Sequence, residues 1–444
     1  MFFPLRHVLL PLVLTSGAAM SQTVTESTVP VLTPPPPVSA QLSKTSPLTG
    51  VPEWSQLARW DKTMTLEEFR AAWSTFYSDT KPFPPPWQVT PEKLEIATGG
   101  QLTSTQFVQF RRPEEAAVQP KRWWRRPEEM PPLNDAPPLT DLHIALDPGH
   151  LGGGYSVMEE RHLTFNPSNP QEVVKEGDLT LLTAKVLKPM LEAAGARVSL
   201  VREHLEAATP QRPQDFRSTA LALLAEGGIM NPVDSYAGLT GDAKRITLQW
   251  RTENLFYRVA EIRARADKVN LQLKPDIVVC LHLNAEDWGD AAQPQYSPLN
   301  HLHILINGCY SAPELQLADV RFEALNRLFS RTHEVELPLA EVVAREMADY
   351  TKLPPYVYTT TNARNVGNTP YVYARNLLAN RLYQCPTIYL EPYVMNHQDT
   401  YRRLLRGHYK GRTLADGRLQ TSIIEDYAKS VAKGVVEFYR KRRG

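Results

Sequence analysis

The stretch HIALDPGH, at residues 143–150, constrains this chain more than any other. Residues 144–146 predict a short buried strand, and the DPG that follows ends it, because proline fixes φ and glycine permits a sharp turn. His150 is therefore expected just beyond a strand end. In an open α/β sheet, ligands and metals bind in the crevice beyond the carboxyl ends of the strands. His150 is a candidate metal ligand if other ligand-type residues reach the same edge.

From residue 140 onward, short apolar runs alternate with segments of helical periodicity. The strand-like runs cover residues 144–146, 197–201, 277–281, 301–306 and 387–390. Helical spacing of apolar residues covers residues 179–194, 259–269, 339–350 and 424–438. This alternation predicts an α/β fold, with a mostly parallel twisted sheet covered by helices on both faces. A turn-rich segment at about residues 206–256 is expected to be an insertion.

A small α+β accessory module of unknown role is predicted at residues 51–139, before the domain at 140–444. Thr65 and Glu68 form a potential capping box ahead of an amphipathic helix. Short alternating runs predict strands at residues 87–89, 94–96 and 107–110. The cluster KRWWRR at 121–126 allows two interpretations. We expect its tryptophans to anchor a linker to the neighbouring domain, in preference to binding sugars or an anionic polymer.

The N-terminal 50 residues resemble export and linker sequence rather than folded structure. Residues 1–21 combine Arg6 with an apolar run and small residues, as secretory signal peptides do, so the mature chain is expected near Ser21 or Gln22. Residues 22–50 are rich in Pro, Thr and Ser and predict a tether. No later apolar run reaches the roughly 18 residues of a membrane span. These features predict an exported protein, periplasmic or extracellular, with no transmembrane anchor after cleavage.

Charge and cysteine content limit what this chain is expected to be. The 49 basic and 48 acidic residues give a net charge of +1, which offers no reason to expect nucleic acid. Three cysteines are too few and too scattered for a disulfide framework, and buried structural thiols are expected at Cys280, Cys309 and Cys385.

Three strand-like runs of the main domain end in residues suited to metal or acid–base chemistry. These residues are His150, His282 and Glu391, and Glu176 precedes the first helix. Parallel strands deliver their carboxyl ends to one edge, so these side chains are expected to converge. Two imidazoles and a carboxylate suit a catalytic Zn²⁺ ion with an open fourth position. A second carboxylate is then needed as general base and acid, and Glu391 fits that role.

Five motifs follow one another along the main domain: DPGH at 147–150, KEGDLTL at 175–181, AGARV at 194–198, LHLNA at 281–285 and TIYLEPYVMN at 387–396. In this order they resemble the motifs of the zinc-dependent N-acetylmuramoyl-L-alanine amidases that cut bacterial peptidoglycan. The resemblance runs over about residues 140–440 and does not extend to the N-terminal part.

The resemblance implies a site and a reaction. In that family the positions of His150, Glu176 and His282 hold zinc, and the position of Glu391 is catalytic. The reaction implied is hydrolysis of the amide between N-acetylmuramic acid and L-alanine, with peptidoglycan or a muropeptide as substrate and a possible protein activator. Asn284 is a candidate substrate-binding residue, although it can equally serve to end its strand.

The chain departs from the family pattern in the first loop. Leu151 separates DPGH from the glycine run, and His150 and Glu176 are 26 positions apart (176 − 150), more than is usual. Three rival ligands lie in that loop: Glu159, Glu160 and His162. Glu176 is favoured because it directly precedes an apolar-periodic helix.

Two other functions fit the same residues. One is a catalytically inactive peptidoglycan-binding or partner-activating protein with an amidase-like fold, since fold does not guarantee activity. The other is a zinc peptidase acting on cross-linking peptides. Whether the insertion at 206–256 covers the cleft is a further open question.

Overall fold

The computed structural model describes residues 42–444 apart from 82, 100–104, 170, 288, 290–293 and 416. The predicted signal peptide and most of the predicted tether lie outside these residues. The last part of the tether segment packs against the body of the protein. The backbone N–H of Ala318 donates to the Lys44 carbonyl at 2.8 Å, and Arg321 Nη2 donates to the Leu42 carbonyl at 2.9 Å.

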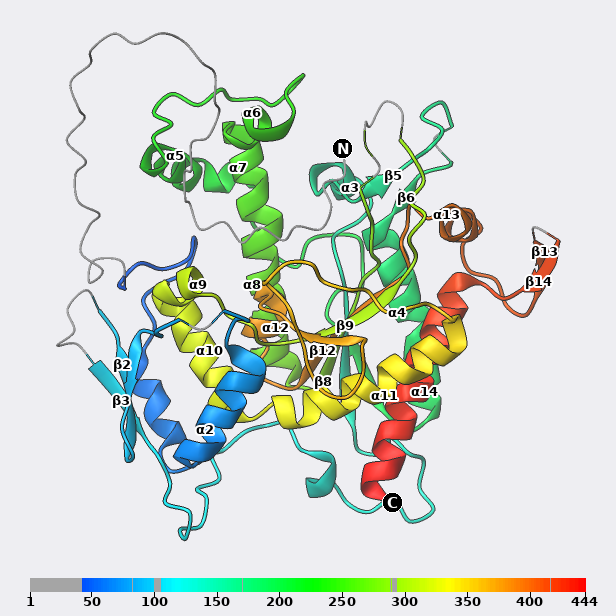
Figure 1. The fold of residues 1–444 in the computed structure, drawn as a ribbon. Coiled ribbons are helices and arrows are strands. Elements are labelled where there is room, and N and C mark those ends of the chain that lie inside the picture. The colour runs from blue at the N-terminus through cyan, green and yellow to red at the C-terminus, as the bar shows by residue number, and fades with distance from the viewer. Residues whose placement is uncertain are drawn as a thin grey trace.

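The main domain is built on a twisted seven-stranded sheet (Figure 1). In spatial order its strands are β10 (Arg364–Asn365), β11 (Val372–Ala374), β9 (Leu302–Ile306), β12 (Thr387–Pro392), β8 (Ile277–Leu281), β4 (His143–Pro148) and β7 (Arg197–Leu200). The pairs β12–β9 and β10–β11 are antiparallel and the others parallel. The central strands are buried along their whole length, as apolar runs covered on both faces require. The predicted mostly parallel α/β fold is confirmed.

Helices cover both sides of this sheet, as Figure 1 shows. On one side lie α4 (Glu176–Ala193), α11 (His333–Thr351) and α14 (Ile423–Arg443), which pack against one another. Gly434 allows the close approach of α14 to α11, because an added Cβ would meet the Val343 Cα at 2.7 Å. On the other side lie α8 (Glu261–Asp267) and α12 (Leu378–Leu382).

Helix α11 begins before the residues that its periodicity indicated. The spacing of apolar residues predicted a helix over residues 339–350, but α11 starts at His333 and includes Pro338, although proline in a helix interior is unfavourable. A buried ion pair between Glu336 and Arg327 holds the first turns in place. The side chain of Glu336 also accepts a hydrogen bond from the backbone N–H of Thr387 at 2.8 Å.

One long helical stretch runs from within the predicted insertion to the sheet. It consists of α7 (Leu248–Asn254), η5 (Leu255–Ala260), α8 (Glu261–Asp267) and η6 (Lys268–Leu273), of which the two η segments are π-helical. The rest of the insertion carries η4 (Pro213–Phe216), α5 (Arg217–Glu226) and α6 (Gly241–Arg245). Figure 1 shows these short helices gathered at the far end of α7. The insertion therefore connects directly to a helix that contacts the sheet.

The N-terminal module has the predicted elements. They are η1 (Trp54–Trp60), α2 (Leu66–Ala72), η2 (Trp73–Tyr77) and an antiparallel sheet of β1 (Trp87–Val89), β2 (Lys93–Ala97) and β3 (Thr105–Gln109). Both hydrogen bonds of the Thr65–Glu68 capping box form, at 3.1 and 2.8 Å. Its core includes side chains of α9 (Ala312–Gln316) and α10 (Ala318–Ser330), as in the stacked rings of Phe69 and Phe329.

The KRWWRR cluster fastens the following linker to the main domain. Trp124 is buried in the main core, and the Arg122 guanidinium lies 4.0 Å from the centre of its ring. Trp123 Nε1 donates to the Pro275 carbonyl at 3.1 Å, and Arg125 forms an ion pair with Asp276. These contacts agree with the predicted anchoring role.

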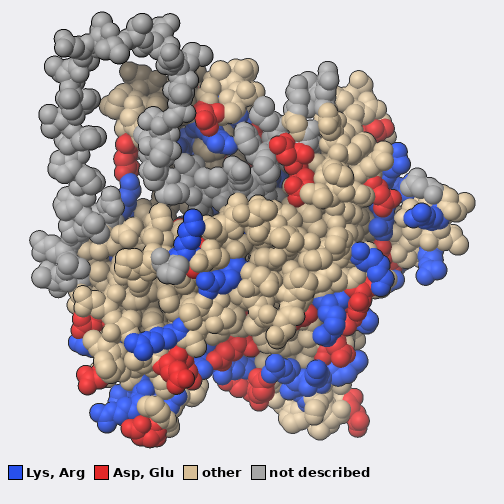
Figure 2. All heavy atoms as spheres, viewed as in Figure 1, with Lys and Arg blue, Asp and Glu red and all other residues tan. Residues whose placement is uncertain are grey.

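The remaining elements are short. They are η3 (Pro127–Glu129), α3 (Tyr155–Met158), β5 (His162–Leu163), β6 (Val174–Lys175), α13 (Gln398–Leu405), β13 (Thr413–Ala415) and β14 (Arg418–Gln420). All three cysteines are free and buried, as predicted. Among the described residues, none of the helices combines the length and apolarity needed to cross a membrane. On the face in Figure 2, basic and acidic side chains are interspersed, in keeping with the near-zero net charge.

Candidate metal centre

The strand register brings the predicted residues to one edge of the sheet. Strands β4, β8 and β12 run parallel, and the backbone N–H of His282 donates to the Leu390 carbonyl at 3.0 Å, so His282 and Glu391 leave adjacent strands together. His150 follows β4 with a positive φ of 58°, a conformation that few residues adopt without a tight turn. Glu176 is the first residue of α4. The convergence expected from strand ends is therefore observed.

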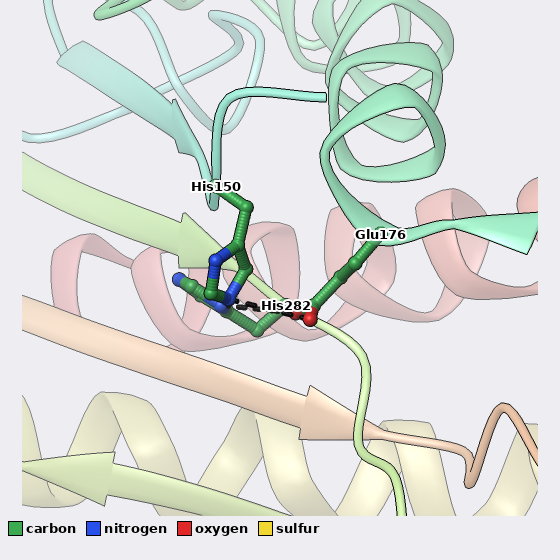
Figure 3. A group of neighbouring side chains, drawn as sticks. All are labelled: His150, Glu176 and His282. Carbon is green, nitrogen blue, oxygen red and sulfur yellow. Dashed lines mark hydrogen bonds and ion pairs between the residues drawn. The ribbon is translucent and has the colours of Figure 1, made fainter. Parts of the chain in front are cut away.

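His150, Glu176 and His282 point toward one another from three different elements (Figure 3). Within the described part of the chain they form the one group of this kind, with candidate ligand atoms all within 4.8 Å of one another. His150 Nε2 lies 3.3 Å from Glu176 Oε2, and His282 Nδ1 lies 3.2 Å from Glu176 Oε1. Glu176 and His282 are buried, and the His150 side chain is about one-fifth exposed.

These distances fit a metal ion. Tetrahedral zinc with bonds of about 2.1 Å separates its ligand atoms by about 3.4 Å, close to both separations given above. A ligating histidine usually turns its second nitrogen toward a carboxylate, and His150 Nδ1 lies 3.7 Å from Glu159 Oε2. The donor set of two imidazoles and one carboxylate, with one carboxylate behind it, suits a catalytic zinc ion.

The three side chains bias one another electrostatically. Burial opposes ionisation of Glu176, but the charge of His150 and hydrogen bonds from both histidines outweigh it and hold the Glu176 pKa well below its usual range. Burial lowers the pKa of His282 to about 4, although Glu176 opposes the shift. Burial also opposes protonation of His150, but Glu176 and Glu159 raise its pKa overall. Glu176 is therefore a carboxylate and His282 a neutral imidazole at neutral pH, as metal binding requires.

Glu391 differs from the other carboxylate in its environment. It is 3% exposed, and its Oε2 is a buried atom without a hydrogen-bond partner. Burial and the nearby charge of Glu176 raise the Glu391 pKa well above its usual range, and Arg161 and Arg375 offset this only in part. A carboxyl group with a raised pKa beside a metal centre is suited to accept and return a proton.

Asn284 joins two loops at the edge of the site. Its backbone N–H donates to the Tyr393 carbonyl at 2.9 Å, and its own carbonyl accepts from Met395 N–H at 2.7 Å. Its Oδ1 accepts from the backbone N–H of Ala285 at 2.9 Å. These bonds tie the segment after β8 to the segment after β12, and the substrate-binding role of Asn284 stays a prediction.

The three rival ligands have other contacts. Glu159 accepts a hydrogen bond from the backbone N–H of Leu151 at 2.9 Å and lies behind His150. Glu160 forms an ion pair with Lys244 of the insertion. His162 Nδ1 lies 3.3 Å from the Ser156 carbonyl oxygen.

Two arginines that contact the candidate site were missed by the sequence reasoning. Arg265, in α8, binds Asp147 and the carbonyls of Pro148 and His150, and so fixes the DPGH turn. Arg161 lies directly against the candidate ligands, with its Nε 3.3 Å from His150 Nε2 and 3.5 Å from Glu176 Oε2. Arg265 is 115 positions from His150 and carries no local signal, whereas Arg161 stands beside the rival ligands already identified.

A search of known proteins found one local sequence similarity. A probable cell wall amidase LytH from Staphylococcus saprophyticus is 44% identical over 69 residues, which span 16% of this chain and 21% of the relative. The resemblance drawn from the motifs is thereby confirmed as a local one. No family model matches the chain.

Solved structures of amidases were also found. N-acetylmuramyl-L-alanine amidase Ami1 from Mycobacterium smegmatis matches 68% of this chain and 99% of its own, at 14% identity and a TM-score of 0.36. AmiC2 of Nostoc punctiforme matches 68% and 98%, at 13% identity and a TM-score of 0.34. CwlD of Clostridioides difficile, solved with the GerS lipoprotein, matches 68% and 98%, at 12% identity and a TM-score of 0.36.

Proposed function

We propose that this protein is a zinc-dependent N-acetylmuramoyl-L-alanine amidase of bacterial peptidoglycan. The observation that carries the proposal is the convergence of His150, Glu176 and His282 within 4.8 Å, at the edge of the sheet where Glu391 lies near the end of β12. The local identity to a cell wall amidase supports the substrate class.

His150, Glu176 and His282 are the residues that would hold the metal. Their separations suit tetrahedral coordination, and Glu159 behind His150 supplies the carboxylate that orients its ring. Bound there, zinc would lower the pKa of a coordinated water to about 7 and polarise the substrate carbonyl. The buried position of Glu176 limits competing water around the centre.

Glu391 is the proposed general base and acid. Its unpartnered Oε2 is free to receive the proton of the attacking water, and its raised pKa lets it keep that proton. When the carbon–nitrogen bond breaks, Glu391 returns the proton to the departing nitrogen of L-alanine. The lactoyl carboxylate of N-acetylmuramic acid and the free amine of the stem peptide are the products.

The remaining assignments complete the proposal. The substrate is peptidoglycan or a muropeptide, a protein activator is a possible partner, and the protein acts outside the cytoplasm after removal of residues 1–21. Residues 140–444 form the catalytic domain, and residues 51–139 form an accessory module, preceded by the tether at 22–50. Asn284 is kept as a candidate substrate contact.

The direct test is metal-dependent hydrolysis of a muramyl peptide. Purified mature protein is stripped with a chelator, dialysed and assayed before and after one equivalent of Zn²⁺, with release of the L-alanine amine as the readout. We expect activity to be lost on stripping and restored by zinc. Zinc binding without hydrolysis would favour a binding protein, and release of peptides cut elsewhere would favour a peptidase.

A further inference from the structure

Arg161 lies where a metal in the candidate centre would meet its ligands. Its Nε lies 3.3 Å from His150 Nε2 and forms an ion pair with Glu176 Oε2 at 3.5 Å. The side chain is largely buried, at 12% exposed. A guanidinium in this position brings positive charge directly against two of the candidate ligands.

The backbone of Arg161 is held against the same ligand. The backbone N–H of Glu176 donates to the Arg161 carbonyl at 3.1 Å, and the Arg161 N–H donates to the Ser156 carbonyl at 2.8 Å. Directly after Arg161, strand β5 pairs with β6, the strand that leads into Glu176. The unusually long loop between His150 and Glu176 therefore folds back and delivers Arg161 to the centre.

Arg161 and a metal cannot use the site together in this geometry. Arg161 Nε lies 3.3 Å from His150 Nε2, the same atom that would be needed for coordination. The separations of 3.3 and 3.5 Å from Arg161 Nε to the two ligand atoms match the edges of a metal tetrahedron, about 3.4 Å. Arg161 Nε thus stands where a further ligand of the metal would stand. A guanidinium and a metal ion that close together repel each other strongly.

We propose that Arg161 competes with the metal for His150 and Glu176, holding the metal-free site in order and leaving when zinc binds. The inference rests on the proposed metal centre but does not require that the protein be an amidase. The proposal gives the unusually long loop between His150 and Glu176 a role in metal binding.

A contact from the insertion reaches the neighbouring residue. Lys244, at the end of α6, forms an ion pair with Glu160, and its ammonium lies 4.3 Å from the centre of the Tyr236 ring. Because Glu160 is bonded to Arg161 in the chain, this contact fixes the loop that must move when Arg161 leaves. Loosening it should ease the displacement of Arg161.

The test compares zinc affinity and metal-free stability in Arg161→Gln and in the wild type. Affinity is measured by competition with a chromophoric chelator, and stability by thermal unfolding of the chelator-stripped protein. We expect Arg161→Gln to bind zinc about tenfold more tightly, or about 1.4 kcal/mol, and to unfold at a lower temperature when metal-free. Lys244→Gln should tighten zinc binding in the same direction and by less.

Arg217→Gln is the matched control, because it removes an arginine of the insertion whose ion pair with Asp234 is exposed. It should change neither quantity. If Arg161→Gln fails to fold, Arg161→Met, which keeps an apolar side chain of similar length but loses the charge and the donors, must still show tighter zinc binding. Equal or weaker zinc binding in the Arg161 variants would overturn the proposal while leaving the metal centre intact. Absence of zinc binding in the wild type as well would overturn both.

Discussion

Replacing Arg265 with methionine should destabilise the DPGH turn, because the Arg265 side chain binds the backbone of that turn. The Arg265 side chain is 5% exposed, with Nη1 3.0 Å from Asp147 Oδ1 and Nε 2.8 Å from Glu261 Oε1. It also donates to the Pro148 carbonyl at 2.7 Å and to the His150 carbonyl at 2.9 Å. One guanidinium therefore neutralises two buried carboxylates and holds the backbone on both sides of Gly149.

The magnitude follows from the charges left behind. Both carboxylates are at most 5% exposed, so Arg265→Met removes the cation that pairs directly with each of them. Removing one partner of a buried ion pair costs about 3–5 kcal/mol in proteins. At about 2–4 °C per kcal/mol for a domain of this size, the midpoint of thermal unfolding should fall by about 10 °C. The turn that presents His150 also loses two hydrogen bonds, so zinc affinity should fall.

The measurement is the free energy of unfolding in urea for the chelator-stripped proteins, with Arg217→Met as the control for loss of an exposed arginine. The Arg217 pair with Asp234 is 60% and 75% exposed and should contribute less than about 0.5 kcal/mol. If Arg265→Met lowered the free energy of unfolding by less than about 1 kcal/mol, and by no more than the control does, the role of Arg265 in holding the DPGH turn would be refuted.

Three further predictions concern the site and acid stability. Glu391→Gln should keep one equivalent of zinc by elemental analysis but lose hydrolysis by about 100- to 10,000-fold, and retained turnover would remove Glu391 from the mechanism. An added Cβ at Gly149 would lie 2.2 Å from His282 Cε1, so Gly149→Ala should weaken zinc binding by at least about tenfold, whereas Gly154→Ala, which has open space, should not. Burial lowers the pKa of His333 from 6.5 to about 3, so the unfolded chain takes up a proton that the folded protein refuses. The contribution of His333 to stability is therefore complete above pH 6.5 and falls as the pH decreases toward 3, by about 3 kcal/mol at pH 4. His333→Gln should reduce the slope of stability against pH by that contribution in urea unfolding between pH 7 and 4. An unchanged slope would contradict this explanation.

The elements that local chemistry specifies were predictable from the sequence. The Thr65–Glu68 capping box forms because both partners lie within one helical turn. The convergence of His150, His282 and Glu391 follows from parallel strands, since their carboxyl ends share an edge whatever the residues between them. These inferences needed periodicity and turn chemistry alone.

The features that depend on distant contacts could not be predicted in this way. Helix α11 passes through Pro338 because the buried Arg327–Glu336 pair, made between two helices, holds its first turns. Arg265 reaches the DPGH turn from a helix more than 100 positions away, and Arg161 reaches the centre only because β5 and β6 pair. Such partners can be identified only when the structure shows which distant residues lie together.

The central claim is that zinc at His150, Glu176 and His282 serves hydrolysis of the muramyl amide. Mass spectrometry of purified muropeptides, digested by the zinc-loaded protein, identifies the bond that is cut. The account predicts stem peptides with a free L-alanine amine and intact N-acetylmuramic acid, formed by the wild type and not by Glu391→Gln. Cleavage between stem-peptide residues, or unchanged muropeptides with zinc bound at one equivalent, would contradict it.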